Sequence, residues 1–342
     1  MSQLLTAVGV DLPVIAAPMA GGPSTPELVT AAAQVGSLGF LAGGYKTPQA
    51  LAEQIHAVRE QGVSFGVNLF APNPIPVDEE SYRRYARSVQ SEADRFGIEL
   101  PREPIEDDDY WAEKIDLLIA GPVPWVSFTF GIPDRSIISA LRNAGSTVLQ
   151  SVTSSDEARQ AAESGVDALI VQSSAAGGHS GTLTPASPPA HVPLPDLVAA
   201  VRRVTRLPLV AAGGIADADD VAAAINAGAD AAMVGTVLLR THESGASGPH
   251  KAALVDPAFT TTTVTRAFTG RPARALRNDF IDRYEAAAPN GYPALHHLTS
   301  PLRKAATAAG DTRLIHLWAG TGHRRARVEP VGDTLTRLAG RL

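Results

Sequence analysis

The chain has 342 residues, of which 44% are hydrophobic and 19% are charged. That is enough apolar material for one large α/β domain or two smaller ones. With a net charge of −6 and no cysteine, we expect no nucleic-acid partner, disulfide, cysteine-ligated metal or thiol nucleophile. The start MSQLLTAVGVDLP has no signal-peptide pattern, and no apolar run reaches the roughly 18–20 residues of a membrane span. We therefore expect a cytoplasmic protein that does not enter a membrane.

Short apolar runs alternate with helical segments along the first 240 residues. The runs lack polar alternation, which is typical of parallel strands buried on both faces. The expected strands are 13–19, 38–42, 64–70, 125–130, 147–151, 167–171, 208–212 and 230–234. Two of the intervening segments begin with a capping residue ahead of a proline, as at many helix starts: Ser24 or Thr25 before Pro26, and Thr47 before Pro48.

Eight strands separated by helices predict a parallel sheet with right-handed crossovers. Eight such units in about 230 residues favour a closed TIM (β/α)8 barrel, an α/β fold, over an open doubly wound sheet. The open sheet stays the alternative, although neither GxGxxG nor GxxxxGK[ST] occurs. We expect a barrel over residues 1–240, an insertion over its mouth at 71–110 after the third strand, and a helical C-terminal cap on the substrate side at 241–342. Within the insertion, the acidic run 106–109 is interpreted as a solvated loop or helix cap and not as a metal site.

The stretch 167–182, DALIVQSSAAGGHSGT, joins a buried strand to a flexible loop. Gln172 ends the strand, and two glycines precede His179, a side chain that titrates near neutral pH. The pattern is typical of an active-site rim. A structural turn that carries a solvated histidine would give the same residues, so both interpretations stay open here.

In a barrel of this kind the loops after the strands converge on one face. The candidates there are Ala20 to Gly22, Asn68, Gln172 to His179, Gly213-Gly214 and Gly235-Thr236. The last two loops follow the seventh and eighth strands, where barrels bind phosphate through backbone N–H groups. Together they indicate a phosphorylated ligand, although a tight turn explains either glycine pair alone.

Other sequence patterns give weaker evidence for a catalytic or metal site. A nucleophile elbow, GxSxG, would need glycine where Thr182 stands. His296 and His297 are adjacent, so on a helix they point apart and do not form a metal site. The remaining histidines are expected to be surface or core residues: His56, His191, His242, His250, His316 and His323.

The assembled motifs resemble the nitronate monooxygenase family, formerly called 2-nitropropane dioxygenases, which are FMN-containing barrels. The resemblance rests on PVIAAPMAGGPSTPELV, FGVNLF, VSFTFGIP, AGGHSG, VAAGGI, MVGT, ESGA and GRPAR, and it covers nearly the whole chain. It implies an FMN-dependent oxidation of alkyl nitronates, of the propionate 3-nitronate type, by dioxygen. It makes His179 the active-site histidine. The implied FMN contacts are Asn68, Gln172, Gly177, Gly214, Met233, Val234, Gly235 and Thr236.

Two departures from the family pattern bear on substrate preference. The family's QGxEAGGH is QSSAAGGH here, with Ala175 and Ala176 at the acidic position, and its WxGQG is WAGTG, with Thr321 for glutamine. FMN-dependent NAD(P)H-using enoyl-acyl-carrier-protein or quinone reductases share the barrel and the AGGH loop, so a reductase is the alternative. A flavin-binding protein with another role is a third possibility, and no oligomeric state is predicted.

Overall fold

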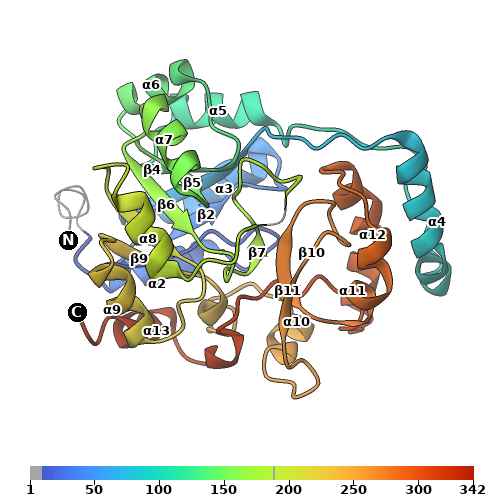
Figure 1. Ribbon diagram of the computed structural model, residues 1–342. Helices are drawn as coiled ribbons and strands as arrows, with labels where there is room; N and C mark the ends of the chain where they lie inside the picture. The colour runs from blue at the N-terminus through green and yellow to red at the C-terminus, as the bar shows by residue number, and fades with distance from the viewer. Residues whose placement is uncertain (1–9, 188) are drawn as a thin grey trace.

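The computed structural model describes residues 10–187 and 189–342 (Figure 1). At its centre lies a sheet of eight parallel strands, in the order β1-β9-β8-β6-β5-β4-β3-β2. The strands are β1 Val14–Ala16, β2 Phe40–Ala42, β3 Gly66–Ala71, β4 Trp125–Phe130, β5 Thr147–Val152, β6 Ala168–Gln172, β8 Leu209–Ala212 and β9 Ala231–Val234. A parallel bridge between Ala16 and Gly39 joins the two outer strands, so the sheet closes into a TIM barrel. Every strand expected from the sequence is present, and the barrel prediction is confirmed.

Helices cover the outside of the barrel, as the alternation of the sequence predicted (Figure 1). They are α2 Pro26–Gln34, α3 Pro48–Arg59, α5 Trp111–Ala120, α6 Arg135–Asn143, α7 Ser155–Ser164, α8 Leu194–Arg202 and α9 Ala218–Asn226. The threonine-proline starts behave as expected, because the side chains of Thr25 and Thr47 accept hydrogen bonds from Leu28 N and Ala50 N. At α9, Asp217 and Asp220 form a capping box.

Two buried clusters hold the barrel together. One fills its interior with side chains from strands all round the sheet, among them Ile15, Phe40, Trp125, Ile170 and Met233. The other packs the outward-facing strand residues against α3 and α5 to α9. Apolar residues thus cover both faces of the strands, which explains why their sequences show no alternation.

The rest of the chain builds a second layer on one side of the barrel, seen at the right of Figure 1. Its elements are α4 Glu79–Phe96, β7 Gly178–His179, α10 Gly248–Ala253, β10 Thr262–Thr265, β11 Ala273–Leu276, α11 Asp279–Tyr284, η2 Glu285–Ala287 and α12 Ala294–Ala308. The short helix η1 Thr236–Leu238 follows β9 in the barrel and contacts η3 His323–Arg325. Helix α13, Val331–Leu338, instead packs back on α2 and β1. A small antiparallel sheet, β10-β11-β7, lies in this layer, which the expected helical cap did not include.

Helix α4, in the expected insertion, packs against the C-terminal helices. Tyr82, Tyr85 and Val89 share a buried cluster with Leu295 and Leu298 of α12. The Tyr85 hydroxyl group donates to Ala267 O over 2.5 Å. The insertion and the C-terminal segment therefore share one core.

The acidic run makes specific contacts. Asp107 lies 2.7 Å from His297 Nε2, and Asp109 lies 2.8 Å from Lys114 Nζ and accepts the N–H of Tyr45 over 3.0 Å. In residues 10–187 and 189–342 no three His, Asp or Glu side chains gather as a metal site would require. Over the same residues, no helix is both long and apolar enough to cross a bilayer.

Candidate active site

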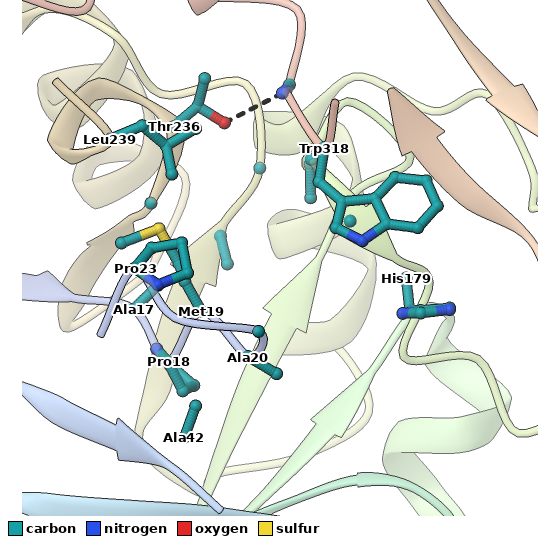
Figure 2. A pocket seen from close by; sticks show the side chains of 18 of the residues that line it. Ala17, Pro18, Met19, Ala20, Pro23, Ala42, His179, Thr236, Leu239 and Trp318 are labelled. Atoms are coloured by element: carbon teal, nitrogen blue, oxygen red, sulfur yellow. Dashed lines mark hydrogen bonds between the residues drawn. The ribbon is translucent and has the colours of Figure 1, made fainter. Parts of the chain in front are cut away.

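A cavity of about 290 Å³ opens where the carboxyl ends of the strands converge (Figure 2). Its walls are formed by the loop that follows β1, the end of β3, the loop between β6 and β7, and the loops after β8 and β9. The nine residues that the family resemblance implies all line it: Asn68, Gln172, Gly177, His179, Gly214, Met233, Val234, Gly235 and Thr236. Of the wider candidate loops, Gly22 and residues 173–175 do not line it. The volume is close to the ~300 Å³ lower end of ligand sites.

The loop after β8 presents backbone to the cavity. Gly213 has φ +101° and Gly214 has φ +82°, and a Cβ on Gly214 would lie 3.0 Å from the Cβ of Ala175. Within the described residues, the N–H groups of Gly214 and Thr236 donate to no acceptor. The N-terminus of α9 is already capped by Asp217 and Asp220, so these loop amides, and not the helix end, are the donors available to an anion.

The C-terminal segment closes over these loops. Gly320 N donates to Thr236 Oγ1 over 2.9 Å, the bond drawn in Figure 2, and Thr321 N donates to Ala175 O over 3.1 Å. A Cβ on Gly177 would come 2.5 Å from Gly320 N, so only glycine permits this approach. The two departures from the family pattern, at Ala175 and Thr321, therefore meet at one point beside Gly214.

Two side-chain amides are oriented by their neighbours. Asn68 Oδ1 accepts the hydroxyl groups of Ser127 over 2.9 Å and Thr129 over 3.0 Å, which leaves Nδ2 as the free donor on the cavity wall. Gln172 Oε1 accepts Gly181 N over 2.7 Å, and its Nε2 donates to His179 O over 3.3 Å. Gln172 thus holds the loop that carries His179.

Three aromatic rings surround His179. The ring centroids of Trp318, Phe130 and Tyr292 lie 5.4, 5.7 and 5.8 Å from the imidazole centroid, and Thr269 Oγ1 lies 2.9 Å from Nε2. Burial, with a smaller contribution from nearby positive charge, lowers the pKa of His179 from 6.5 to about 3. His179 is therefore neutral at physiological pH.

The positive charge comes from two buried arginines. Arg271 Cζ lies 3.8 Å from the centroid of the Phe130 ring, and its guanidinium donates to Asn73 O and Thr182 O. Arg303 donates to Thr299 Oγ1 and His296 O. Neither forms an ion pair with a carboxylate in the described part of the chain. Burial lowers the pKa of each to about 10, so both keep their charge and make the region positive.

Several residues of the site were not predicted from the sequence. His250 and His316 were expected to be ordinary surface or core residues, yet both line the cavity, as does Trp318. His250 Nε2 lies 3.0 Å from Trp318 O, and burial lowers its pKa to about 4. Tyr45, also on the cavity wall, stacks on His296 with 4.1 Å between ring centroids. Only the tertiary fold brings these segments together, and no local pattern marks them.

A TIM barrel with glycine loops at the carboxyl ends of β8 and β9 and a cavity above them is typical of a cofactor-binding barrel enzyme. Comparison with known proteins gives the family. The nitronate monooxygenase family profile matches residues 2–340, so the chain belongs to the nitronate monooxygenase family and is an oxidoreductase that acts on a small molecule. The family and its flavoenzyme neighbours imply a flavin cofactor.

The similar proteins span the whole chain. A probable nitronate monooxygenase of Staphylococcus aureus (strain Newman) is 35% identical over 346 residues, which cover 100% of this chain and 97% of that protein. The crystal structure of a nitroalkane oxidase from Streptomyces ansochromogenes matches with a TM-score of 0.94 at 45% identity, covering 99% of this chain and 97% of that one. FabK from Thermotoga maritima matches with a TM-score of 0.78 at 25% identity, covering 99% and 95%.

Proposed function

We propose that the chain is an FMN-dependent enzyme that oxidises alkyl nitronates, of the propionate 3-nitronate type, with dioxygen. The observation that carries this proposal is a neutral His179 on the cavity wall, in the positive field of Arg271 and Arg303, two buried arginines with no carboxylate partner in the described residues. A nitronate is an anion whose charge lies on its nitro oxygens. Binding it here compensates two charges that are otherwise costly to bury.

The residues around the cavity suit FMN. In the part of the chain that the structure describes, the backbone N–H groups of Gly214 and Thr236 have no acceptor, and such groups fit a phosphate group. A Cβ at position 214 would lie 3.0 Å from the Cβ of Ala175 and 3.5 Å from Thr321 Oγ1, so the loop is closely packed there. Asn68 Nδ2 makes no hydrogen bond within the described residues and is suited to donate to a ring heteroatom, and Met233 to Gly235 line the same cavity. Bound there, FMN supplies the electron acceptor for the oxidation.

The protein's own groups then have distinct tasks. The arginines stabilise negative charge on the substrate, and the rings of Phe130, Tyr292 and Trp318 restrict water around His179. A nitronate needs no proton removed. A neutral nitroalkane must lose one from its α-carbon, and we assign that task to His179.

Two measurements test this function. The purified protein should be yellow and release FMN when it is denatured. It should consume dioxygen when propionate 3-nitronate is added. Recovery of another cofactor would overturn the FMN assignment, and an FMN-loaded protein that leaves nitronates unoxidised would overturn the reaction.

A further inference from the structure

The turn before β11 brings Thr269 against the active-site histidine. β11 pairs antiparallel with β7, and Ala273 lies opposite His179 in this pairing. Thr269 Oγ1 is 2.9 Å from His179 Nε2 and is also 3.2 Å from the carbonyl oxygen of Arg271. Thr269 is 1% exposed and Arg271 is fully buried, so water does not compete for these contacts.

The hydroxyl group of Thr269 has one proton to give. In the described residues, no other donor reaches the Arg271 carbonyl oxygen, and leaving a buried carbonyl unpaired is unfavourable. Thr269 therefore donates to Arg271 O. Its oxygen already accepts Arg271 N at 3.4 Å, and the remaining lone pair accepts the N–H of His179 at Nε2.

The neutral ring has only one N–H. With that proton on Nε2, the Nδ1 atom of His179 carries a free lone pair. Among the described residues Nδ1 has no hydrogen-bond partner, and it is not one of the buried unpartnered atoms. Because His179 lines the cavity beside Trp318 (Figure 2), Nδ1 is open to the substrate.

We propose that Thr269 is a positioning residue that fixes His179 in the Nε2–H tautomer and so presents Nδ1 to the cavity as a proton acceptor. This inference rests on the proposed function, in which His179 contacts the substrate. It adds a residue from the C-terminal segment to the site and gives each ring nitrogen one task.

The tautomer of His179 matters for substrates that must lose a proton and not for substrates that are already anions. With a neutral nitroalkane, the bond between the α-carbon and its hydrogen breaks and a new N–H bond forms at Nδ1. The electron pair stays on the substrate, which becomes a nitronate, and His179 becomes a cation that still donates to Thr269. With a preformed nitronate no proton moves. Thr269 therefore matters more for nitroalkanes than for nitronates.

The test compares Thr269→Val, which keeps the shape and removes the hydroxyl group, with Thr269→Ser, which keeps the hydroxyl group. The ¹⁵N chemical shifts of the imidazole nitrogens, measured without substrate on flavin-loaded protein, report the tautomer independently of turnover. A His179→Asn spectrum assigns the resonances. The second readout is kcat/KM for nitroethane divided by kcat/KM for ethyl nitronate.

We expect His179 to carry its proton on Nε2 in the wild-type and serine proteins and to lose this preference in the valine protein. The nitroethane ratio should fall about 10-fold or more in the valine protein, because a mispositioned histidine costs on the order of 10- to 100-fold or more. The serine protein should stay within about 3-fold of wild type.

A proton on Nδ1 in the wild-type protein overturns the inference, even if the valine variant fails to fold. An unchanged tautomer and an unchanged ratio in a folded valine protein overturn it as well. Failure of the proposed function is a different result, namely an FMN-loaded wild-type protein that does not oxidise ethyl nitronate, whatever its tautomer.

Discussion

Replacing Gly214 tests whether the loop after β8 holds the flavin phosphate. The backbone there has φ +82°, and a Cβ would lie 3.0 Å from the Cβ of Ala175. A non-glycine residue in this left-handed region costs about 1–2 kcal/mol, and less for Asn or Asp. Gly214→Asn and Gly214→Asp share that cost and differ only in charge. Two like charges about 4 Å apart repel by about 4 kcal/mol at an effective dielectric constant of 20.

Each change of about 1.4 kcal/mol in binding free energy changes the affinity tenfold, so even two thirds of that repulsion weakens FMN binding about 100-fold. Fluorescence titration of flavin-free protein with FMN should therefore show Gly214→Asp binding at least about 100-fold more weakly than Gly214→Asn. Gly165→Asp is the matched control. It has φ +94° at the end of α7, no atom within 4 Å of a Cβ, and no place on the cavity wall. It should lose a similar amount of stability and bind FMN normally. Equal FMN affinity of the two Gly214 variants would refute the phosphate assignment.

Three further outcomes are expected. His179→Asn should retain FMN but lose about 100-fold or more in turnover, with nitroalkanes affected more than nitronates; wild-type rates with both would make His179 structural. The pKa of His250 is 6.5 in the unfolded chain and about 4 in the folded protein. Because the unfolded chain takes up the proton first, the free energy of unfolding is highest above pH 6.5 and falls by about 3 kcal/mol as the pH is lowered to 4. Urea unfolding at pH 7 and pH 4.5 should therefore show a smaller loss for His250→Gln, and an equal loss would contradict this. Asp109→Asn weakens the anchor of Tyr45 and should change the relative rates for small and large nitronates; unchanged relative rates would remove the insertion from substrate selection.

The insertion is tested with point substitutions, because deleting residues 73–102 would also disrupt the buried core. The deletion would remove Tyr82 and Tyr85, which are fully buried against the C-terminal helices. It would also remove the carbonyl oxygen of Asn73, to which Arg271 donates.

The barrel could be predicted from the sequence because its signals are local. Each strand is a short apolar run, and helix starts such as Thr25-Pro26 carry their own capping residue. The loops that follow parallel strands converge by geometry alone. Residues as distant in sequence as Asn68, His179 and Gly214 could therefore be placed on one face, and they line one cavity.

The C-terminal contribution could not be predicted in the same way. β10 and β11 are four residues each, and Thr262 to Val264 are only half-buried, so the apolar pattern is weak. His250 on α10 and Trp318 in the segment after α12 both line the cavity. The low pKa of His179 arises from burial and from Arg271 and Arg303, which lie far from it in sequence. Such effects depend on tertiary packing, which no local pattern encodes.

Anaerobic reduction of the flavin tests the account most directly. Yellow, FMN-loaded protein is mixed without dioxygen with propionate 3-nitronate in one experiment and with NAD(P)H in another, and the absorbance of the oxidised flavin is followed. We expect the nitronate to bleach the flavin and dioxygen to restore the colour. Rapid bleaching by NAD(P)H with no response to the nitronate would instead identify a reductase. A flavin that neither compound bleaches would indicate a flavin-binding protein with another role.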